Sequence, residues 1–411
     1  MSKINRNTGK WRFCGLFFAV LAGMCVSWSD GAAGVSRGEI DQIRKLSVLQ
    51  ESHLAKLEQF ITEQFELMKN SQSDPDASNP AQELSETSQS DVRRDEQLQK
   101  VYSNKFATVV KAANKNLWSY AEGLSDKKLA ERLKLQGVAV LANVDNISVL
   151  DDLLVLCEDK AMEIRYWAVK GLTMPRVQEY LRANGAENEA ARQKVITALD
   201  KILDAETDGL VIGQIALAGL PEGSGGRLLQ KCVSKRVALY KNWQVDNELV
   251  DLDIIGSIMA AVSSGQLSNS QQAQVDLMRS AVELYTAAFL RYIKGMRHEI
   301  DANKVIIVLS EASQNELLTL LVEGEKGFIR MANSTRSIRF LADAKKQNWT
   351  VLYNSFGRLV GPKGDLQQVF PVYPATMEEG KYLVEIADVP QSLVDAAVVR
   401  EKMKEDVITY P

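Results

Sequence analysis

The residues best suited to acid–base chemistry are Arg297, His298 and Glu299, because they place an imidazole between a cation and a carboxylate. The surrounding pattern is helical, and consecutive residues of a helix point about 100° apart. These three side chains therefore cannot converge on one atom, and we interpret them as a solvated helix end near Asp301. The chain's other histidine is His53. Two histidines are too few for a histidine-rich metal centre, which is therefore also excluded.

Other segments that resemble chemical motifs lack the residues that would complete them. The pairs Asp151–Asp152 and Glu378–Glu379 lie in charged, surface-like runs with no aromatic pocket nearby to raise a pKa. The glycine-rich stretch 219–226 has no strand before it and no Gly-Lys-Ser/Thr after it, so a loop explains it better than a phosphate cradle. Neither a Gly-x-Ser-x-Gly elbow nor a Cys/His metal spacing occurs. We predict no catalytic, cofactor-binding or metal-binding residues and no cofactor.

Composition describes an ordinary soluble globular protein. The chain has 411 residues, which allows two or three domains, and its 45% hydrophobic and 25% charged residues exclude wholesale disorder and a polytopic membrane protein. Its formal net charge of -4 argues against a dedicated nucleic-acid binder, which must neutralise phosphates.

The N-terminus has the order of a secretory signal peptide. Four cations precede an apolar run from Phe13 to Val26, and small residues follow at Ser27 and Ser29. We predict a signal peptide over residues 1–29, with an uncleaved N-terminal anchor as the alternative. Cleavage would leave no membrane span and an acidic chain located in the periplasm or secreted, with a bacterial envelope favoured. Such an acidic surface argues against electrostatic binding to anionic lipid or nucleic acid.

Two of the four cysteines, Cys14 and Cys25, belong to the predicted signal peptide. The mature chain would keep Cys157 and Cys232, which is too few for a disulfide scaffold. In a stack of helical units these two residues would belong to units that are not neighbours. We therefore expect both thiols to be free and buried as small apolar residues.

The mature chain divides into four parts by composition. Residues 35–69 have apolar side chains at helical spacing and predict an amphipathic or coiled-coil helix, with weak self-association through 39–68 as one role. Residues 70–92 are rich in Ser, Gln, Asp, Asn and Pro and predict a disordered linker. Residues 93–346 show one helical pattern after another, and residues 347–411 form a proline-marked tail.

Several local signals set the expected element boundaries. Ser125 is expected to be an N-cap, and Ser313 with Glu316 is expected to form a capping box. In the tail we expect a small hairpin around 354–357, an extended segment that packs on a neighbouring surface, and a last short helix over 392–404. The main body is predicted to be all-α.

The segment 149–172 carries the clearest repeat signal. An apolar helix ends near Asp159, and a second helix places Ile164, Ala168 and Leu172 on one face, with the small Ala168 allowing close helix packing. This segment resembles a HEAT repeat, with Asp159 at the turn and Ile164, Arg165 and Ala168 at the second-helix positions. The frame Ile164–Leu172 recurs more weakly 31 residues earlier, at Leu133–Leu141, and 48 residues later, at Ile212–Leu220.

The HEAT resemblance implies an α-solenoid that serves as a binding scaffold without chemistry of its own. On the second helix, Tyr166 lies roughly 160° from Ala168, which predicts that it is exposed on the face of the stack with Trp167 on the flank. We expect Tyr166 and Trp167 to bind an envelope protein or peptide. The alternative is an envelope hydrolase or polymer-binding enzyme whose site is assembled from dispersed carboxylates.

Overall fold

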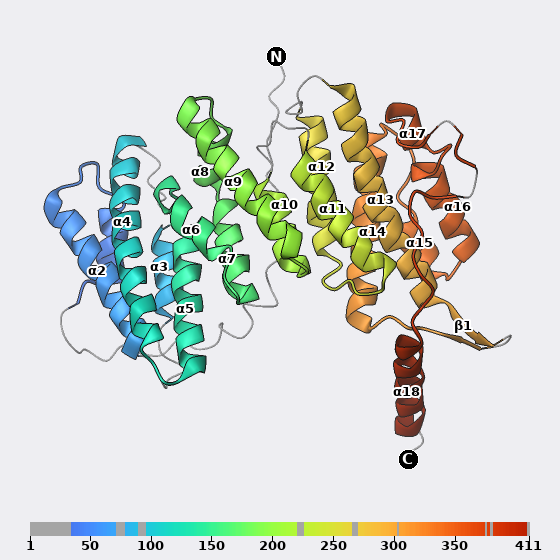
Figure 1. Ribbon diagram of the computed structural model, residues 1–411, viewed down its shortest axis with the longest axis horizontal. Helices are drawn as coiled ribbons and strands as arrows, with labels where there is room; N and C mark the ends of the chain where they lie inside the picture. Colours follow the sequence, from blue (N-terminus) through green and yellow to red (C-terminus); the bar gives the residue numbers. More distant parts are fainter. Residues whose placement is uncertain are drawn as a thin grey trace.

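The computed structural model describes residues 34–70, 79–88, 96–219, 226–264, 270–301, 304–374, 376–378 and 381–408. These residues are predominantly helical, which confirms the all-α prediction (Figure 1). The predicted signal peptide, residues 1–29, lies outside the described residues. None of the described helices is both long and apolar enough to cross a membrane.

The body consists of two rows of helices that pack on each other. The helices of the first row each precede a helix of the second row, and these pairs pack together. In the second row, each helix also contacts the next one along the chain, and Figure 1 shows the pairs side by side from α4 to α14. The first row comprises α4 (Glu96–Glu122), α6 (Leu150–Leu156), α9 (Ala186–Ala205), α11 (Arg227–Lys241) and α13 (Gln271–Met296). The second row comprises α5 (Lys127–Ala142), α7 (Met162–Leu172), α10 (Gly209–Ala218), α12 (Val250–Ser263) and α14 (Glu311–Met331).

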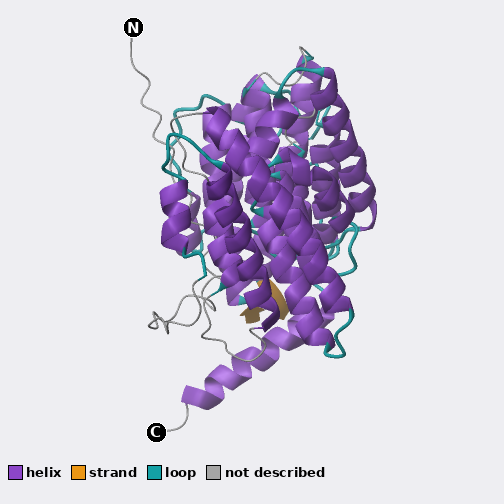
Figure 2. Cartoon of the chain, turned by 90° about the vertical axis from the view of Figure 1, so that its left-hand side faces the viewer, coloured by secondary structure: helices purple, strands orange, loops and turns teal. Residues whose placement is uncertain are grey.

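The remaining elements lie outside these two rows, and Figure 2 shows the last helix, which ends near the C mark, projecting from the helical body. The amino-terminal end carries α1 (Arg37–Ile43), α2 (Glu51–Asn70) and α3 (Pro80–Ser88), and the 3-10 helix η1 (Ile147–Val149) and α8 (Pro175–Arg182) lie between the pairs. The carboxyl-terminal end carries β1 (His298–Asp301), β2 (Lys304–Ile306), α15 (Phe340–Lys345), α16 (Trp349–Val360), α17 (Asp365–Val369) and α18 (Gln391–Ile408). The strands β1 and β2 form an antiparallel pair.

Two expected helix starts were wrong by one to three residues. The N-cap of α5 is Asp126 instead of Ser125, and its carboxylate accepts hydrogen bonds from the amides of Lys128 and Leu129. The N-cap of α14 is Ser310, whose hydroxyl accepts from the amide of Ser313. Helix α14 therefore begins about one turn earlier than expected, and the earlier serine caps it.

The amino-terminal segment is two helices instead of one. Helix α1 ends at Ile43 and α2 begins at Glu51, so the single continuous helix expected over 35–69 was wrong. Leu57, Ile61 and Met68 of α2 are fully buried, and α2 packs on α4 of the same chain. Self-association through these apolar positions would require α2 to leave α4.

The expected disordered linker was wrong over residues 79–88, which include α3. Ala81 and Leu84 of α3 are buried, and α3 packs on α2 and α5. The hydroxyl of Ser88 donates to the carbonyl oxygen of Asn143 at 2.6 Å. Buried apolar side chains and tertiary polar contacts therefore order a segment whose composition is typical of disorder. The rest of the predicted linker, apart from Asn70, lies outside the described residues.

The tail differs from its predicted structure at one element and agrees at another. The expected hairpin around 354–357 was wrong, because these residues lie inside α16, where Leu352, Phe356 and Leu359 are buried at helical spacing. The predicted last helix is confirmed and is longer than expected, spanning Gln391–Ile408.

The extended part of the tail crosses the body as a strap. The indole nitrogen of Trp243 donates to the carbonyl oxygen of Ala387 at 3.0 Å, and the Lys294 ammonium donates to that of Ile386 at 3.0 Å. Val384 and Ile386 of the strap itself are buried against the body. The strap therefore joins the tail to the turn after α11 and to α13.

A buried ion pair holds α11 and α12 together. Arg236 and Asp251 are both fully buried, and the guanidinium donates to the two carboxylate oxygens at 2.6 and 3.1 Å. The hydroxyl of Tyr240 donates to Asp251 at 2.6 Å, and the guanidinium also donates to the carbonyl oxygen of Asp246 at 2.8 Å. Because each charge has several partners, removal of one would leave the other buried without compensation.

We therefore expect Asp251→Ala to lower the free energy of unfolding by about 3–5 kcal/mol, as breaking a buried pair does. The matched control is Lys201→Ala, which removes an exposed ion pair with Glu158 and should cost less than about 1 kcal/mol. Urea unfolding followed by circular dichroism measures both. Equal losses in the two variants would contradict the assignment of the buried pair.

Candidate binding surfaces

The residues that resembled an acid–base cluster do not form one. The expected helix end was wrong, because α13 ends at Met296 and His298 and Glu299 lie on β1. There His298 pairs with Ile306 and Glu299 with Val305, and successive residues of a strand point to opposite faces. Arg297 makes an ion pair with Glu299 at 3.2 Å, and both side chains are largely exposed. These three side chains therefore cannot act together on one atom of a substrate.

The other chemical candidates are also accounted for by their surroundings. Asp151 and Asp152 on α6 make exposed ion pairs with Lys194 and Lys111, and Glu378 pairs with Lys381. The neighbouring Glu379 lies outside the described residues. Within the glycine-rich loop the structure describes only its ends, where Gly226 has a φ of +78° and caps the start of α11. In the described part of the chain, no group of three or more His, Cys, Asp or Glu residues could hold a metal ion.

Cys157 and Cys232 are free and buried, as predicted. Burial raises the pKa of the Cys157 thiol to about 12, which keeps the nucleophilic thiolate scarce at neutral pH. The Cys232 thiol lies 3.8 Å from the carbonyl oxygen of Ile212. Both residues therefore act as small core side chains.

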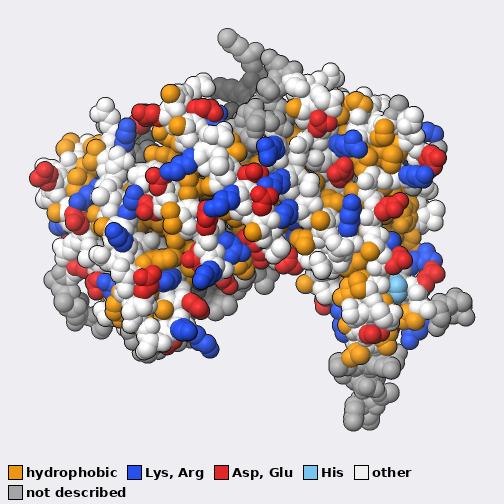
Figure 3. All heavy atoms as spheres, viewed as in Figure 1, with side chains coloured by type: hydrophobic (Ala, Val, Ile, Leu, Met, Phe, Trp, Pro, Cys, Tyr) orange, Lys and Arg blue, Asp and Glu red, His pale blue; other side chains and the backbone are white. Residues whose placement is uncertain are grey.

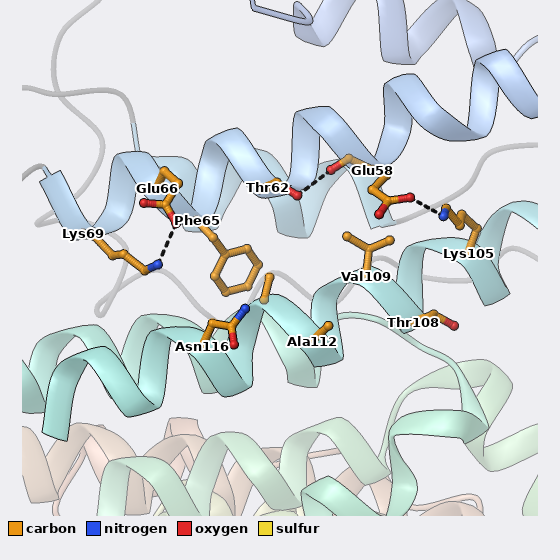
Figure 4. A pocket seen from close by; sticks show the side chains of 11 residues that line it. Glu58, Thr62, Phe65, Glu66, Lys69, Lys105, Thr108, Val109, Ala112 and Asn116 are labelled. Atoms are coloured by element: carbon orange, nitrogen blue, oxygen red, sulfur yellow. Dashed lines mark hydrogen bonds and ion pairs between the residues drawn. The ribbon is translucent and has the colours of Figure 1, made fainter.

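A shallow pocket lies between α2 and α4 at the amino-terminal end (Figure 4). Its apolar lining includes Phe65 and Val109, and ion pairs lie on its rim, with Glu58 bound to Lys105 and Glu66 to Lys69. Its volume of about 210 Å³ is below the range of about 300–1,000 Å³ typical of small-molecule sites. The pocket can accept one apolar side chain of a partner.

The predicted partner-binding residues form an aromatic cluster on α7. The rings of Tyr166 and Trp167 meet edge to face, with centroids 5.8 Å apart and planes at 82°. The Lys170 ammonium lies 4.3 Å from the centre of the Trp167 ring and 5.8 Å from that of Tyr166. A cation over two aromatic faces is an arrangement that holds all three side chains in place.

The exposure of this cluster differs from the expectation. Tyr166 is half-buried instead of exposed, and Trp167 is half-buried as well, both packed against the core. The inward face was predicted correctly, since Ile164, Ala168 and Leu172 are buried. Three helices, α5, α6 and α10, pack around α7, so a side chain far from Ala168 still touches a neighbour.

An ion pair beside this cluster joins α7 to the turn before α10. The Arg165 guanidinium donates to both carboxylate oxygens of Glu206, at 2.7 and 3.0 Å, and to the carbonyl oxygens of Asp159 and Lys160. The amides of Thr207 and Asp208 also donate to Glu206. Burial raises the pKa of the Glu206 carboxyl, but the hydrogen bonds from Arg165 and these amides outweigh burial and hold the pKa below its usual value.

Sequence reasoning missed a series of ion pairs that link successive helices of the first row. Lys194 and Lys201 on α9 bind Asp151 and Glu158 on or just after α6, and each pair is separated by 43 residues. On its other side, α9 presents Asp200 to Lys231 of α11. Complementary charges at a constant separation close to the length of a HEAT repeat were the signal that could have revealed them.

Comparisons with known proteins yield no relative: no protein-family model matches the sequence, and neither does any curated protein or solved structure. The surfaces above must therefore be judged on their own geometry.

We expect Glu206→Gln to lower the free energy of unfolding by about 1.5–3 kcal/mol at neutral pH, the size of a hydrogen bond to a charged group. A carboxyl whose folded-state pKa is depressed stabilises the fold above its unfolded pKa, and this stability is lost as the pH falls through the folded value. The difference between the variant and the wild type should therefore shrink as the pH falls below about 4.3. Urea titrations at a series of pH values measure it, and a constant difference would contradict the role of this carboxylate.

Proposed function

We propose that the chain is an exported, non-enzymatic scaffold of HEAT-like helical repeats that binds another envelope protein or peptide. Of the three segments that share the repeat frame, 133–141 lies in α5, 164–172 lies in α7, and residues 212–218 of the third lie in α10; these helices contact one another in succession. The fifth position of each segment is a small, buried residue, namely Gly137, Ala168 or Ala216. Equivalent positions in consecutive helices therefore hold small side chains that let neighbouring helices pack closely, as an α-solenoid requires.

The observation that carries the binding function is the cluster of Tyr166, Trp167 and Lys170. Half-buried aromatic rings held rigidly by packing lose little entropy when a partner covers their remaining exposed area. Lys170 adds a charge that can meet a carboxylate of the partner. The export of the scaffold to the envelope is proposed from the pattern of residues 1–29 alone.

The rival hypothesis, a hydrolase, needs carboxylates that converge on a substrate. Glu248 and Glu316 do lie close together, and burial followed by the charge of Glu248 raises the pKa of Glu316. Glu248 is itself buried and makes an ion pair with Arg291 at 3.2 Å. This pair is better explained as support for the loop between α11 and α12, so the scaffold remains our proposal.

We expect Trp167→Ala to weaken binding of the partner at least tenfold, because truncating a packed aromatic anchor costs about 2 kcal/mol or more. Tyr166→Ala should weaken binding by a similar factor. The matched control is Tyr120→Ala on α4, where a tyrosine also lies beneath a lysine, Lys69, at 5.7 Å. The partner is first captured from an envelope fraction with the wild-type chain and identified, and affinities for it are then measured by titration.

Melting temperatures of the same variants separate binding from folding. If Trp167→Ala and Tyr166→Ala lower the melting temperature strongly but bind as the wild type does, the cluster is structural and the proposed site is wrong. Weakening in the Tyr120 control equal to that in the α7 variants would also contradict it.

A further inference from the structure

One segment of the carboxyl-terminal half, residues 326–363, is strongly cationic. Residues 326–363 contain eight Lys or Arg residues and a single acid, Asp343, a local charge of +7 in a chain whose net charge is -4. The remainder of the chain therefore carries -11. Asp343 is buried, and so is Glu325 just before this segment, whose carboxylate accepts from the amides of Arg339 and Phe340. These two acids therefore face the interior, and the charged side chains that residues 326–363 expose are all cations.

Most of these cations have no compensating carboxylate. Two of the eight are paired, Lys326 with Glu323 and Arg336 with Asp365. Five others are exposed and make no ion pair within the described part of the chain; they are Arg330, Arg339, Lys345, Lys346 and Arg358. Their charge is available to an anionic partner.

The short helix α15 combines these cations with exposed aliphatic side chains. Its inner face is fixed by Phe340, which is buried against the rings of Phe289 and Tyr292. One turn later Ala344 is also buried. The flank about 100° around the helix from this buried face presents Leu341 and Lys345, which are four residues apart and both exposed.

Ile338 continues this outer side on the amino-terminal flank of the helix. It is 46% exposed and Leu341 is 39% exposed, so both aliphatic side chains have apolar area still to bury. Arg339 and Lys346 lie at either end of the helix and are exposed. We call Ile338, Arg339, Leu341, Lys345 and Lys346 the α15 strip.

We propose that the α15 strip is a docking surface for an anionic lipid bilayer. A flat surface of acidic headgroups attracts cations, and aliphatic side chains between those cations can enter the boundary with the acyl chains. A nucleic acid would be met by exposed aromatic rings that stack on bases, but the aromatic residue of α15 points inward. The strip thus combines cations with exposed aliphatic side chains, as an amphipathic helix at a membrane interface does, but over a shorter length.

The position of the strip decides which end of the molecule would meet the bilayer. In Figure 1, α15 lies among the helices at the end opposite to α2. Binding through the strip would therefore place this end of the molecule at the membrane surface.

The test is co-sedimentation of the full chain with vesicles of phosphatidylcholine mixed with phosphatidylglycerol, and with vesicles of phosphatidylcholine alone. We expect Lys345→Gln/Lys346→Gln to weaken binding to the anionic vesicles about 30-fold, since each cation near such a surface contributes roughly a fivefold factor. The matched control is Lys127→Gln/Lys128→Gln, a second pair of adjacent exposed lysines, at the start of α5. This control should bind as the wild type does.

A second variant, Ile338→Ser/Leu341→Ser, separates a bilayer from other polyanions. Loss of the two aliphatic side chains should weaken vesicle binding by roughly tenfold without changing the salt dependence. Unchanged vesicle binding in the lysine variant, or an equal loss in the control pair, would overturn the proposal. Full binding by the serine variant would also overturn it, in favour of an acidic protein or nucleic acid that meets charge alone. Circular dichroism melting curves that match the wild type show that each variant is folded.

Discussion

The structure depends on how closely the helices of the second row approach their neighbours. Successive helices can pack this closely only where small residues face each other. A Cβ atom built on Gly171 of α7 would lie 2.8 Å from a methyl group of Leu153 and 3.0 Å from the Cα of Ala142, so any larger side chain would push α6 and α5 away. A Cβ on Gly213 of α10 would likewise collide with Val250 at the start of α12. If one of these contacts opened, every later helix of the row would be displaced, because each is positioned by the one before it.

Buried charges complement this apolar packing by fixing the turns between helices. Arg236 crosses from α11 to Asp251 and to the loop carbonyl oxygens, and Arg165 crosses from α7 to Glu206. Apolar surfaces alone can slide past one another, whereas a bidentate ion pair has one geometry. The turns thus hold the register of the stack, and the small residues hold its spacing.

The exposed charges then divide the surface into regions with different uses. Along the first row, opposite charges meet between neighbouring helices, as with Lys201 and Glu158, and are largely neutralised within the chain. At the α15 strip the cations remain without partners. The view in Figure 3 shows charged side chains of both signs mixed over the helical body, which is consistent with local pairing there. The two proposals above together describe a scaffold that binds a protein or peptide at the cluster of Tyr166, Trp167 and Lys170 and an anionic membrane at the α15 strip.

Much of the fold could be predicted from the sequence because helical periodicity is a local property. The all-α class, the inward face of α7 with Ile164 and Ala168, and the free, buried Cys157 and Cys232 all follow from spacing and composition. The cationic excess of residues 326–363 was also present in the sequence, but averaging the charge over the whole chain concealed it.

Tertiary structure decided the features that depend on a distant partner. Residues 80–88 are helical because α2 and α5 offer Leu84 a place to be buried, and residues 298–306 leave the helical pattern because two short strands pair there. The half-burial of Tyr166 depends on three surrounding helices, and the partner of Arg165 is a glutamate 41 residues away. Periodicity indicates which face of a helix is apolar, but only packing determines which neighbour covers that face. The sequence by itself therefore determined most of the helices, while the tertiary structure decided which of their surfaces remain exposed.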